Sequence, residues 1–274
     1  MALIQCDFVS KCLKRSVEFN IYIPGDKALP GMGPKYPLKT LYILHGYTGC
    51  CSDWFFDSEL GALSELHGLA IVMPNAENHF YVDDTLRGDL YGEFIGRELV
   101  DFTRKIFPLS HKREDTIIGG ISMGGYGALR NGMKYHDVFG HVIGLSPAII
   151  IHELADATEE PNEVGSSRAF YRGVFGDLMT ATERDVDLHW LAQKLHDEGA
   201  EFPEIYYCCG SNDMLVPASR RLHETFERLG VKHVFEEDPG THEGPFFYPH
   251  LKRALDRLDL DRPPVMENPF WIDE

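Results

Sequence analysis

A serine in a glycine-rich turn is the strongest chemical signal in this sequence. The segment 120–124, Gly-Ile-Ser-Met-Gly, follows an apolar run and precedes a plausible helix start. A serine on a tight strand-to-helix turn needs small neighbours, because its backbone is strained and larger side chains would collide with both elements. We therefore predict that Ser122 is a nucleophile. The alternatives are an incidental serine or a phosphate-binding loop, but the Gly-Lys-Ser/Thr ending of such a loop is missing.

A serine hydroxyl attacks only when a base takes its proton, and that base needs an acid to orient it. In the strand–turn–helix arrangement the acid and then the base follow the serine, each at the carboxyl end of a strand. The apolar run 205–209 leads into Asp213, our predicted acid. Asp177 follows no strand pattern, and Asp238 comes only four residues before the candidate base. The alternative for Asp213 is a turn or N-cap aspartate before Pro217.

The predicted base is His242, one of thirteen histidines. It follows a predicted strand over 231–237 and a Gly-containing loop, just before an apolar pattern typical of a final helix. The other histidines precede the acid, fall in helical patterns or lie inside a strand pattern. No H-E-x-x-H or comparable spacing is present, so we predict neither a metal nor a cofactor.

An oxyanion hole needs two backbone N–H donors aimed at the tetrahedral oxygen. One is expected to be the amide of Met123, directly after the serine. The other is expected from the glycine-rich turn after the apolar run 41–44, where we choose Tyr47. We interpret the neighbouring His45 as structural.

Substrate contacts are the least explicit part of the sequence. The aromatic run Trp54-Phe55-Phe56 and the segment 150–170 are the candidate pocket walls, and neither has the long apolar stretch of a lipid tunnel. Trp54 and Tyr126 offer flat faces that suit small or ring-bearing alcohols, so we predict that they bind substrate. The alternative is that they are ordinary core aromatics.

Strand and helix patterns alternate along the chain. Unalternating apolar runs suit strands buried on both faces of a parallel sheet, and they occupy 40–44, 69–73, 116–121, 142–145 and 205–209. Residues 13–23 alternate instead, which predicts an antiparallel edge strand. Helical spacing marks 95–106, 222–229 and 251–258. The pattern predicts an α/β fold with a mostly parallel, twisted sheet and helices on both faces, as one domain over 1–274 with a cap or loop excursion at 150–170.

Composition excludes several classes of function. The chain carries 26 Lys and Arg against 43 Asp and Glu, a formal charge of −17. Such a surface repels phosphate backbones and anionic membranes, so we expect no nucleic-acid and no membrane partner. No apolar run resembles a secretory signal or a bilayer span. The six cysteines show no C-x-x-C spacing and predict reduced thiols in the cytoplasm.

These motifs together resemble the esterase D group of the α/β-hydrolases over residues 15–258. The group includes tributyrin, feruloyl and acetylxylan esterases, S-formylglutathione hydrolases and mycolyltransferases. The segments that carry the resemblance are 44–49, 73–75, 120–129, 210–213 and 240–243. The resemblance implies the α/β-hydrolase fold, a triad of Ser122, Asp213 and His242, and oxyanion donors at Met123 and Tyr47.

The first turn of this sequence reads His-Gly-Tyr-Thr-Gly, unlike the Ser-Gly-Leu-Thr-Cys type associated with S-formylglutathione hydrolases. We therefore expect a tributyrin-esterase-like serine carboxylesterase that hydrolyses small, short-acyl esters through an acyl-enzyme. The alternatives are an S-formylglutathione hydrolase-like thioesterase, an acyltransferase and a hydrolase-fold binding protein without activity. The expected partner is a small-molecule ester, and a homo-oligomer is compatible with the sequence.

Overall fold

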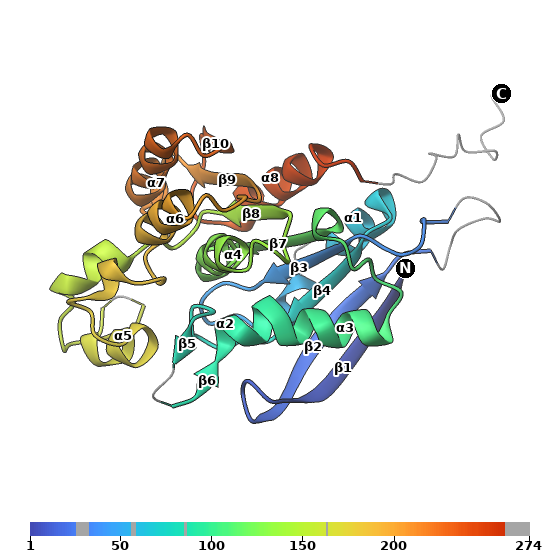
Figure 1. Ribbon diagram of the computed structural model, residues 1–274, viewed down its shortest axis with the longest axis horizontal. Helices are drawn as coiled ribbons and strands as arrows, with labels where there is room; N and C mark the ends of the chain where they lie inside the picture. Colours follow the sequence, from blue (N-terminus) through green and yellow to red (C-terminus); the bar gives the residue numbers. More distant parts are fainter. Residues whose placement is uncertain (26–32, 56–58, 85–86, 163, 261–274) are drawn as a thin grey trace.

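One twisted sheet runs through the molecule (Figure 1). The computed structural model describes residues 1–25, 33–55, 59–84, 87–162 and 164–260, and within them eight strands are hydrogen-bonded in the order β1-β2-β4-β3-β7-β8-β9-β10. They are β1 (Ala2–Ser10), β2 (Arg15–Ile23), β3 (Thr40–Leu44), β4 (Ala70–Pro74), β7 (Thr116–Ile121), β8 (His141–Leu145), β9 (Glu204–Gly210) and β10 (His233–Asp238). From β4 to β10 every pairing is parallel. A separate two-stranded ribbon joins β5 (Asp83–Asp84) to β6 (Asp89–Leu90).

The prediction that residues 13–23 form the edge strand of the sheet was wrong by one strand. Residues 15–23 do form an antiparallel strand, β2, but it pairs with β4 on one side and with β1 on the other. The true edge is β1, which the sequence did not reveal. Its inward face is only partly buried. Cys6 and Phe8 pack against the core, but Leu3, Ile4 and Val9 are exposed, so the apolar residues do not alternate cleanly. Nine consecutive pairings with β2 and the stacking of Phe8 on Phe102 hold the strand.

Helices cover both faces of the sheet (Figure 1). Successive residues of β3 point to opposite sides, so Tyr42 and Leu44 pack in one core cluster and Leu41 and Ile43 in the other. The helices are α1 (Leu60–His67), α2 (Tyr91–Glu93), α3 (Leu99–Ile106), α4 (Met123–Lys134), α5 (Arg168–Phe175), α6 (Leu188–Asp197), α7 (Val216–Leu229) and α8 (Gly244–Asp256). The first cluster also contains apolar side chains of α3, α4, α6 and α7, and the second contains those of α1 and α8. Burial on both sides explains the unalternating apolar runs.

The excursion after β8 is longer than the predicted segment 150–170. Between β8 and α6 the chain forms the short helix η4 (Ile151–Asp156), then α5, then η5 (Ala181–Glu183). Figure 1 shows α5 in a lobe beside the sheet rather than on one of its faces. The sequence pattern missed α5, because its buried residues Tyr171, Val174 and Phe175 lie largely beyond the acidic stretch that marked the excursion.

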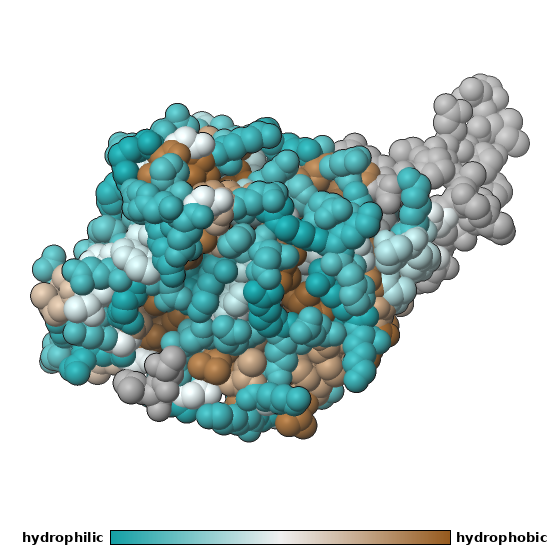
Figure 2. All heavy atoms as spheres, viewed as in Figure 1, coloured by the Kyte–Doolittle hydropathy of each residue, from teal (hydrophilic) through white to brown (hydrophobic). Residues whose placement is uncertain are grey.

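The surface seen in Figure 2 is mostly hydrophilic, with apolar residues in small separate groups. Among the described residues, no helix is both long and apolar enough to cross a membrane. All six cysteines are free, and the thiols of Cys51, Cys208 and Cys209 are buried.

Candidate active site

The residues predicted to act together follow four strands in the parallel part of the sheet. Tyr47 follows β3, Ser122 follows β7, Asp213 follows β9 and His242 follows β10. Because these strands are parallel, their carboxyl ends lie at one edge of the sheet. The topology therefore brings all four segments to the same side of the molecule.

Ser122 lies on the turn between β7 and α4 with a left-handed backbone, φ 56° and ψ −115°. A residue with a side chain held in such a sparsely populated region costs about 1–3 kcal/mol, and such strain clusters at active sites. Three backbone hydrogen bonds hold it there. The Ser122 N–H donates to Leu145 O at 2.8 Å, and its carbonyl accepts from the N–H groups of Tyr126 at 3.0 Å and Ala148 at 2.9 Å.

The two outer glycines of the serine motif are required by close backbone approach. A Cβ on Gly124 would overlap the Leu44 carbonyl of β3, and a Cβ on Gly120 would overlap the Gly124 carbonyl. Without side chains at these positions, α4 begins directly against β3. The first N–H groups of α4 therefore lie next to Ser122.

Asp213 and His242 are hydrogen-bonded to each other. The Nδ1–H of His242 donates to Asp213 Oδ2 at 2.7 Å, and the Leu215 N–H donates to Asp213 Oδ1 at 2.9 Å. The Asp213 side chain is fully buried, whereas His242 is 34% exposed. Burial pushes the pKa of Asp213 upward, but the hydrogen bonds from His242 and Leu215 outweigh it and hold that pKa below its usual value. An ionised Asp213 fixes the imidazole with its Nε2 lone pair free.

Ser146 is a polar residue of this site that the sequence analysis missed. It directly follows β8, between the nucleophile strand and the acid strand, with φ 42° and a fully buried side chain. Its hydroxyl faces the Asp213 carboxylate outside ideal hydrogen-bond geometry and helps to lower the pKa of that group. The detectable signal was a serine placed after the apolar run 142–145, as Ser122 is after 116–121.

His45 supports the turn after β3. Its Nδ1–H donates to Gly46 O at 2.8 Å, and its Nε2 accepts from the Ala76 N–H at 3.1 Å. Burial lowers the pKa of His45, which keeps the ring neutral in this role. The Cβ position of Gly46 lies 3.8 Å from Ser122 Cβ, so the turn sits against the candidate nucleophile. This geometry fits the structural interpretation of His45.

The two predicted oxyanion donors, the amides of Met123 and Tyr47, lie in segments next to Ser122. Met123 is the first residue of α4, so its N–H has no carbonyl one turn earlier within the helix. Tyr47 lies one residue beyond Gly46. Its hydroxyl hydrogen-bonds to that of Ser166 at 2.8 Å, which ties the turn to the excursion. The donor roles of both amides stay predictions.

The two predicted substrate-binding aromatics lie inside the core. Trp54 is 3% exposed and packs with residues of α1 and α8. Tyr126 is fully buried, and its hydroxyl donates to Val186 O at 2.6 Å. Their placement favours the alternative of ordinary core residues, and substrate contact stays a prediction. Phe56, the third residue of the aromatic run, lies outside the described residues.

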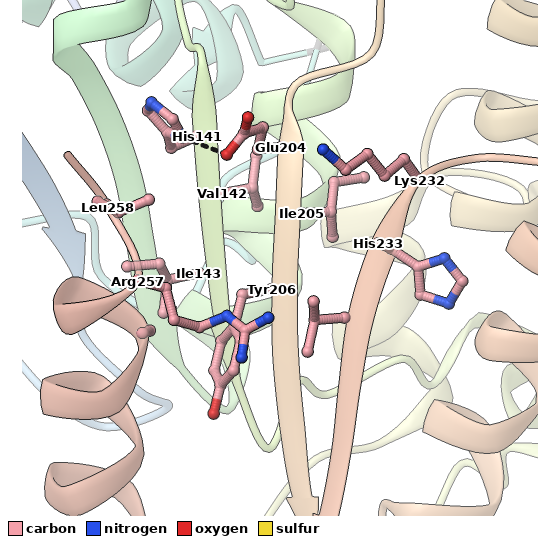
Figure 3. A pocket seen from close by; sticks show the side chains of 12 residues that line it. His141, Val142, Ile143, Glu204, Ile205, Tyr206, Lys232, His233, Arg257 and Leu258 are labelled. Carbon is pink, nitrogen blue, oxygen red and sulfur yellow. Dashed lines mark ion pairs between the residues drawn. The ribbon is translucent and has the colours of Figure 1, made fainter.

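A cavity of about 420 Å³ lies at the opposite end of the strands (Figure 3). His141, Glu204 and Lys232, at or next to the amino ends of β8, β9 and β10, line it together with Arg257. Since Ser122 follows the carboxyl end of β7, this cavity does not serve the candidate triad.

A family model described as "Putative esterase" matches residues 10–258. The chain belongs to this esterase family. An acetyl esterase of Caldicellulosiruptor saccharolyticus is 40% identical to this esterase over 259 residues, which are 93% of this chain and 97% of that protein.

Two solved structures from Staphylococcus aureus resemble this esterase along nearly its whole length. The S-formylglutathione hydrolase FrmB has a TM-score of 0.80 at 26% identity and covers 93% of this chain and 98% of its own. FphF, a fluorophosphonate-binding serine hydrolase, has a TM-score of 0.82 at 28% identity and covers 93% and 97%. The predicted family resemblance, the α/β-hydrolase fold and the activity as a serine-type carboxylic ester hydrolase are confirmed.

Proposed function

We propose that this esterase hydrolyses short-acyl esters through a triad of Ser122, His242 and Asp213. The observation that carries the proposal is the 2.7 Å hydrogen bond between His242 and the buried Asp213 carboxylate. It lies at the same sheet edge as the strained Ser122. A serine, a histidine and an oriented acid in this chain order are what acyl transfer to a serine requires.

The proposed reaction has two steps. Ser122 Oγ attacks the ester carbonyl carbon while its proton passes to His242 Nε2, and the amides of Met123 and Tyr47 stabilise the oxyanion. The bond to the alkoxy group then breaks, and the leaving alcohol takes the proton from His242. In the second step a water gives its proton to His242 and attacks the acyl-enzyme. His242 returns that proton to Ser122 as the carboxylic acid leaves.

The preference for short acyl groups rests on the aromatic side chains around the Tyr47 turn. The Tyr47 ring lies 6.2 Å from that of Phe80 and 5.9 Å from that of Phe170, and Phe80 lies 5.0 Å from Phe175. We infer that these rings occupy the space beside the Tyr47 turn that a long acyl chain would need. The 40% identical acetyl esterase supports the same preference.

The acyl-chain series tests this specificity. We expect kcat/KM for p-nitrophenyl esters to be highest from acetyl to butyryl and to fall by octanoyl. A closed pocket cannot collect the roughly 0.8 kcal/mol that each buried methylene contributes in an open groove. A steady rise toward dodecanoyl would refute the short-acyl claim. A large preference for S-formylglutathione over every oxygen ester would instead favour the thioesterase alternative. The structural similarity to the S-formylglutathione hydrolase FrmB is the reason to include this substrate.

The proposed base predicts a single ascending limb in the pH profile. His242 must be neutral to take the serine proton, so kcat/KM should rise across the range where imidazoles deprotonate, about pH 5–8. Because the pKa of Asp213 is held below its usual value, this carboxylate stays ionised throughout that range. Initial rates in a constant-ionic-strength buffer series measure the limb. A rate independent of pH from 5 to 8 would contradict a histidine base.

We also propose a cytoplasmic setting without a nucleic-acid partner. The formal charge of −17 and the six free cysteines support it. Acidic surfaces repel phosphate backbones, and reduced thiols are usual in the cytosol.

A further inference from the structure

Two histidines and a glutamate meet between α7 and β10, at the end of β10 away from the candidate triad. His223 and Glu227 are one turn apart on α7, and His233 is the first residue of β10, whereas His242 follows the other end of that strand. One ligand atom from each of the three side chains lies within 4.8 Å of the others. We propose that His223, Glu227 and His233 bind a divalent transition-metal ion of the zinc class.

The distances between the ligand atoms suit such an ion. His223 Nδ1 lies 2.8 Å from His233 Nε2, and Glu227 Oε1 lies 3.9 Å from the same nitrogen. Zinc binds nitrogen and oxygen at about 2.0–2.2 Å, so two ligands of a tetrahedral ion lie about 3.4 Å apart. The two observed spacings fall on either side of this value. His223 is half-buried and Glu227 is exposed, so a binding ion can draw both side chains toward this spacing.

The His233 ring is already oriented for a ligand. Its Nδ1–H donates to the Val231 carbonyl at 2.8 Å, so its Nε2 lone pair faces the cluster and accepts a hydrogen bond from His223 Nδ1–H. A bound ion would replace that proton, and His223 would then keep its proton on Nε2. Metal-binding histidines typically make this second hydrogen bond to a carbonyl or carboxylate. The side chain is only 2% exposed and packs beside the rings of Tyr207 and Phe226. Figure 3 shows it pointing away from the other residues that line the cavity.

The charges around the cluster favour a cation. Glu227 contributes the one carboxylate of the cluster, and a carboxylate attracts a cation. The basic side chains nearest on α7 are engaged elsewhere. Arg220 pairs with Glu237, and Arg228 donates to Gln193.

Two other histidine–carboxylate clusters in the described part of the chain are less suited to a bound cation. They are Glu236–Asp238–His250 and His152–Asp187–His189. In the first, the guanidinium of Arg253 already donates to both carboxylates, at 2.6 and 2.8 Å. In the second, both oxygens of Asp187 are engaged: Oδ1 accepts from the His189 N–H at 2.7 Å, and Oδ2 lies 2.9 Å from His152 Nε2. The carboxylates of both clusters therefore already have partners in place of a metal ion.

A bound ion would join the last strand of the sheet to the helix that covers it. In the described residues β10 pairs only with β9, so its other edge is open. An ion held by α7 and β10 binds the folded chain alone and stabilises it by mass action. We therefore expect zinc to raise the thermal unfolding midpoint of this esterase.

Calorimetric titration of untagged, EDTA-treated protein with zinc tests the site. We expect one ion per wild-type chain, and at least a 100-fold loss of affinity in His223→Ala and in Glu227→Gln. Loss of an outer-shell partner alone typically costs about 10–100-fold. Glu227→Gln keeps the shape of an exposed side chain, so it tests the site even where His223→Ala folds poorly. The midpoint increase with zinc should disappear in both variants.

His196→Ala is the matched control. His196 is an exposed imidazole beside Asp197 on α6, outside every three-residue cluster among the described residues. This variant should bind zinc like the wild type. Equal zinc affinity in the wild type, His223→Ala and Glu227→Gln would overturn the proposal, as would no uptake by the wild type. Cobalt can replace zinc as a spectroscopic probe. If the cobalt-loaded protein showed only sulfur-to-metal charge-transfer bands, the ion would be bound by cysteines, and the proposal would again be overturned.

Discussion

Replacing Ser122 by alanine is expected to lower kcat for p-nitrophenyl acetate by about 10⁶. Removing the nucleophile of a serine triad abolishes the covalent route, and losses of about 2 × 10⁶ are known for such a change. Fluorophosphonate labelling should disappear as well, because the adduct forms on the same oxygen. Initial rates and intact-protein mass spectrometry measure the two effects.

Ser16→Ala provides the matched control for that experiment. Ser16 is an exposed serine on β2 that follows no strand-to-helix turn, so its hydroxyl is not activated and should not react with the probe. This variant should therefore keep the label on Ser122. Peptide mapping of the adduct to any serine other than Ser122 would refute the assignment of the nucleophile.

The second large effect is expected for Asp213→Asn, which should lower kcat by up to about 10⁴. The amide no longer fixes the tautomer of His242 and no longer compensates its charge in the transition state. Asp177→Asn is the control, because Asp177 is an exposed carboxylate in the excursion that accepts a hydrogen bond from the Met179 N–H. Near-normal activity of Asp213→Asn beside an inactive Asp177→Asn would show that the acid was wrongly chosen.

The free energy of unfolding of the wild type, compared with that of Asp213→Asn, should change with pH in a defined direction. The folded pKa of Asp213 is lowered, so its ionisation stabilises the fold above the ordinary carboxyl value of about 3.9. That contribution is lost as the pH falls through the folded pKa. The difference in unfolding free energy between the wild type and Asp213→Asn should therefore shrink on acidification, as measured by urea unfolding.

Local sequence patterns predicted those parts of the fold that are buried on both sides. The bounds of β3 and β7 coincide with the apolar runs 40–44 and 116–121, because both faces of these strands are covered. The predicted acid and base were found in the same way, since each follows a strand and a turn. Asp213 and His242 are 29 residues apart in the chain, yet they are hydrogen-bonded in the structure.

Features that depend on contacts between distant segments left no pattern to read. The edge strand β1 is held by pairing with β2 and by the packing of Phe8 on Phe102, and the depth of Trp54 in the core depends on how α1 and α8 pack. The role of Ser146 depends on β8 lying next to β9. His233 meets His223 only because α7 folds back along β10. The spacing of residues within one helix or strand cannot predict such contacts between different elements.

The hydrogen bond between Tyr47 and Ser166 has a consequence for how such enzymes diverge and how they can be engineered. The excursion leaves the sheet after β8 and returns at α6, and this bond attaches it to the turn that follows β3. Under the proposed mechanism, insertions, deletions or grafts within the excursion would act on the Tyr47 turn, which carries a proposed oxyanion donor. A library confined to this stretch is therefore expected to vary substrate selectivity, while Ser122, Asp213 and His242 stay on segments outside it.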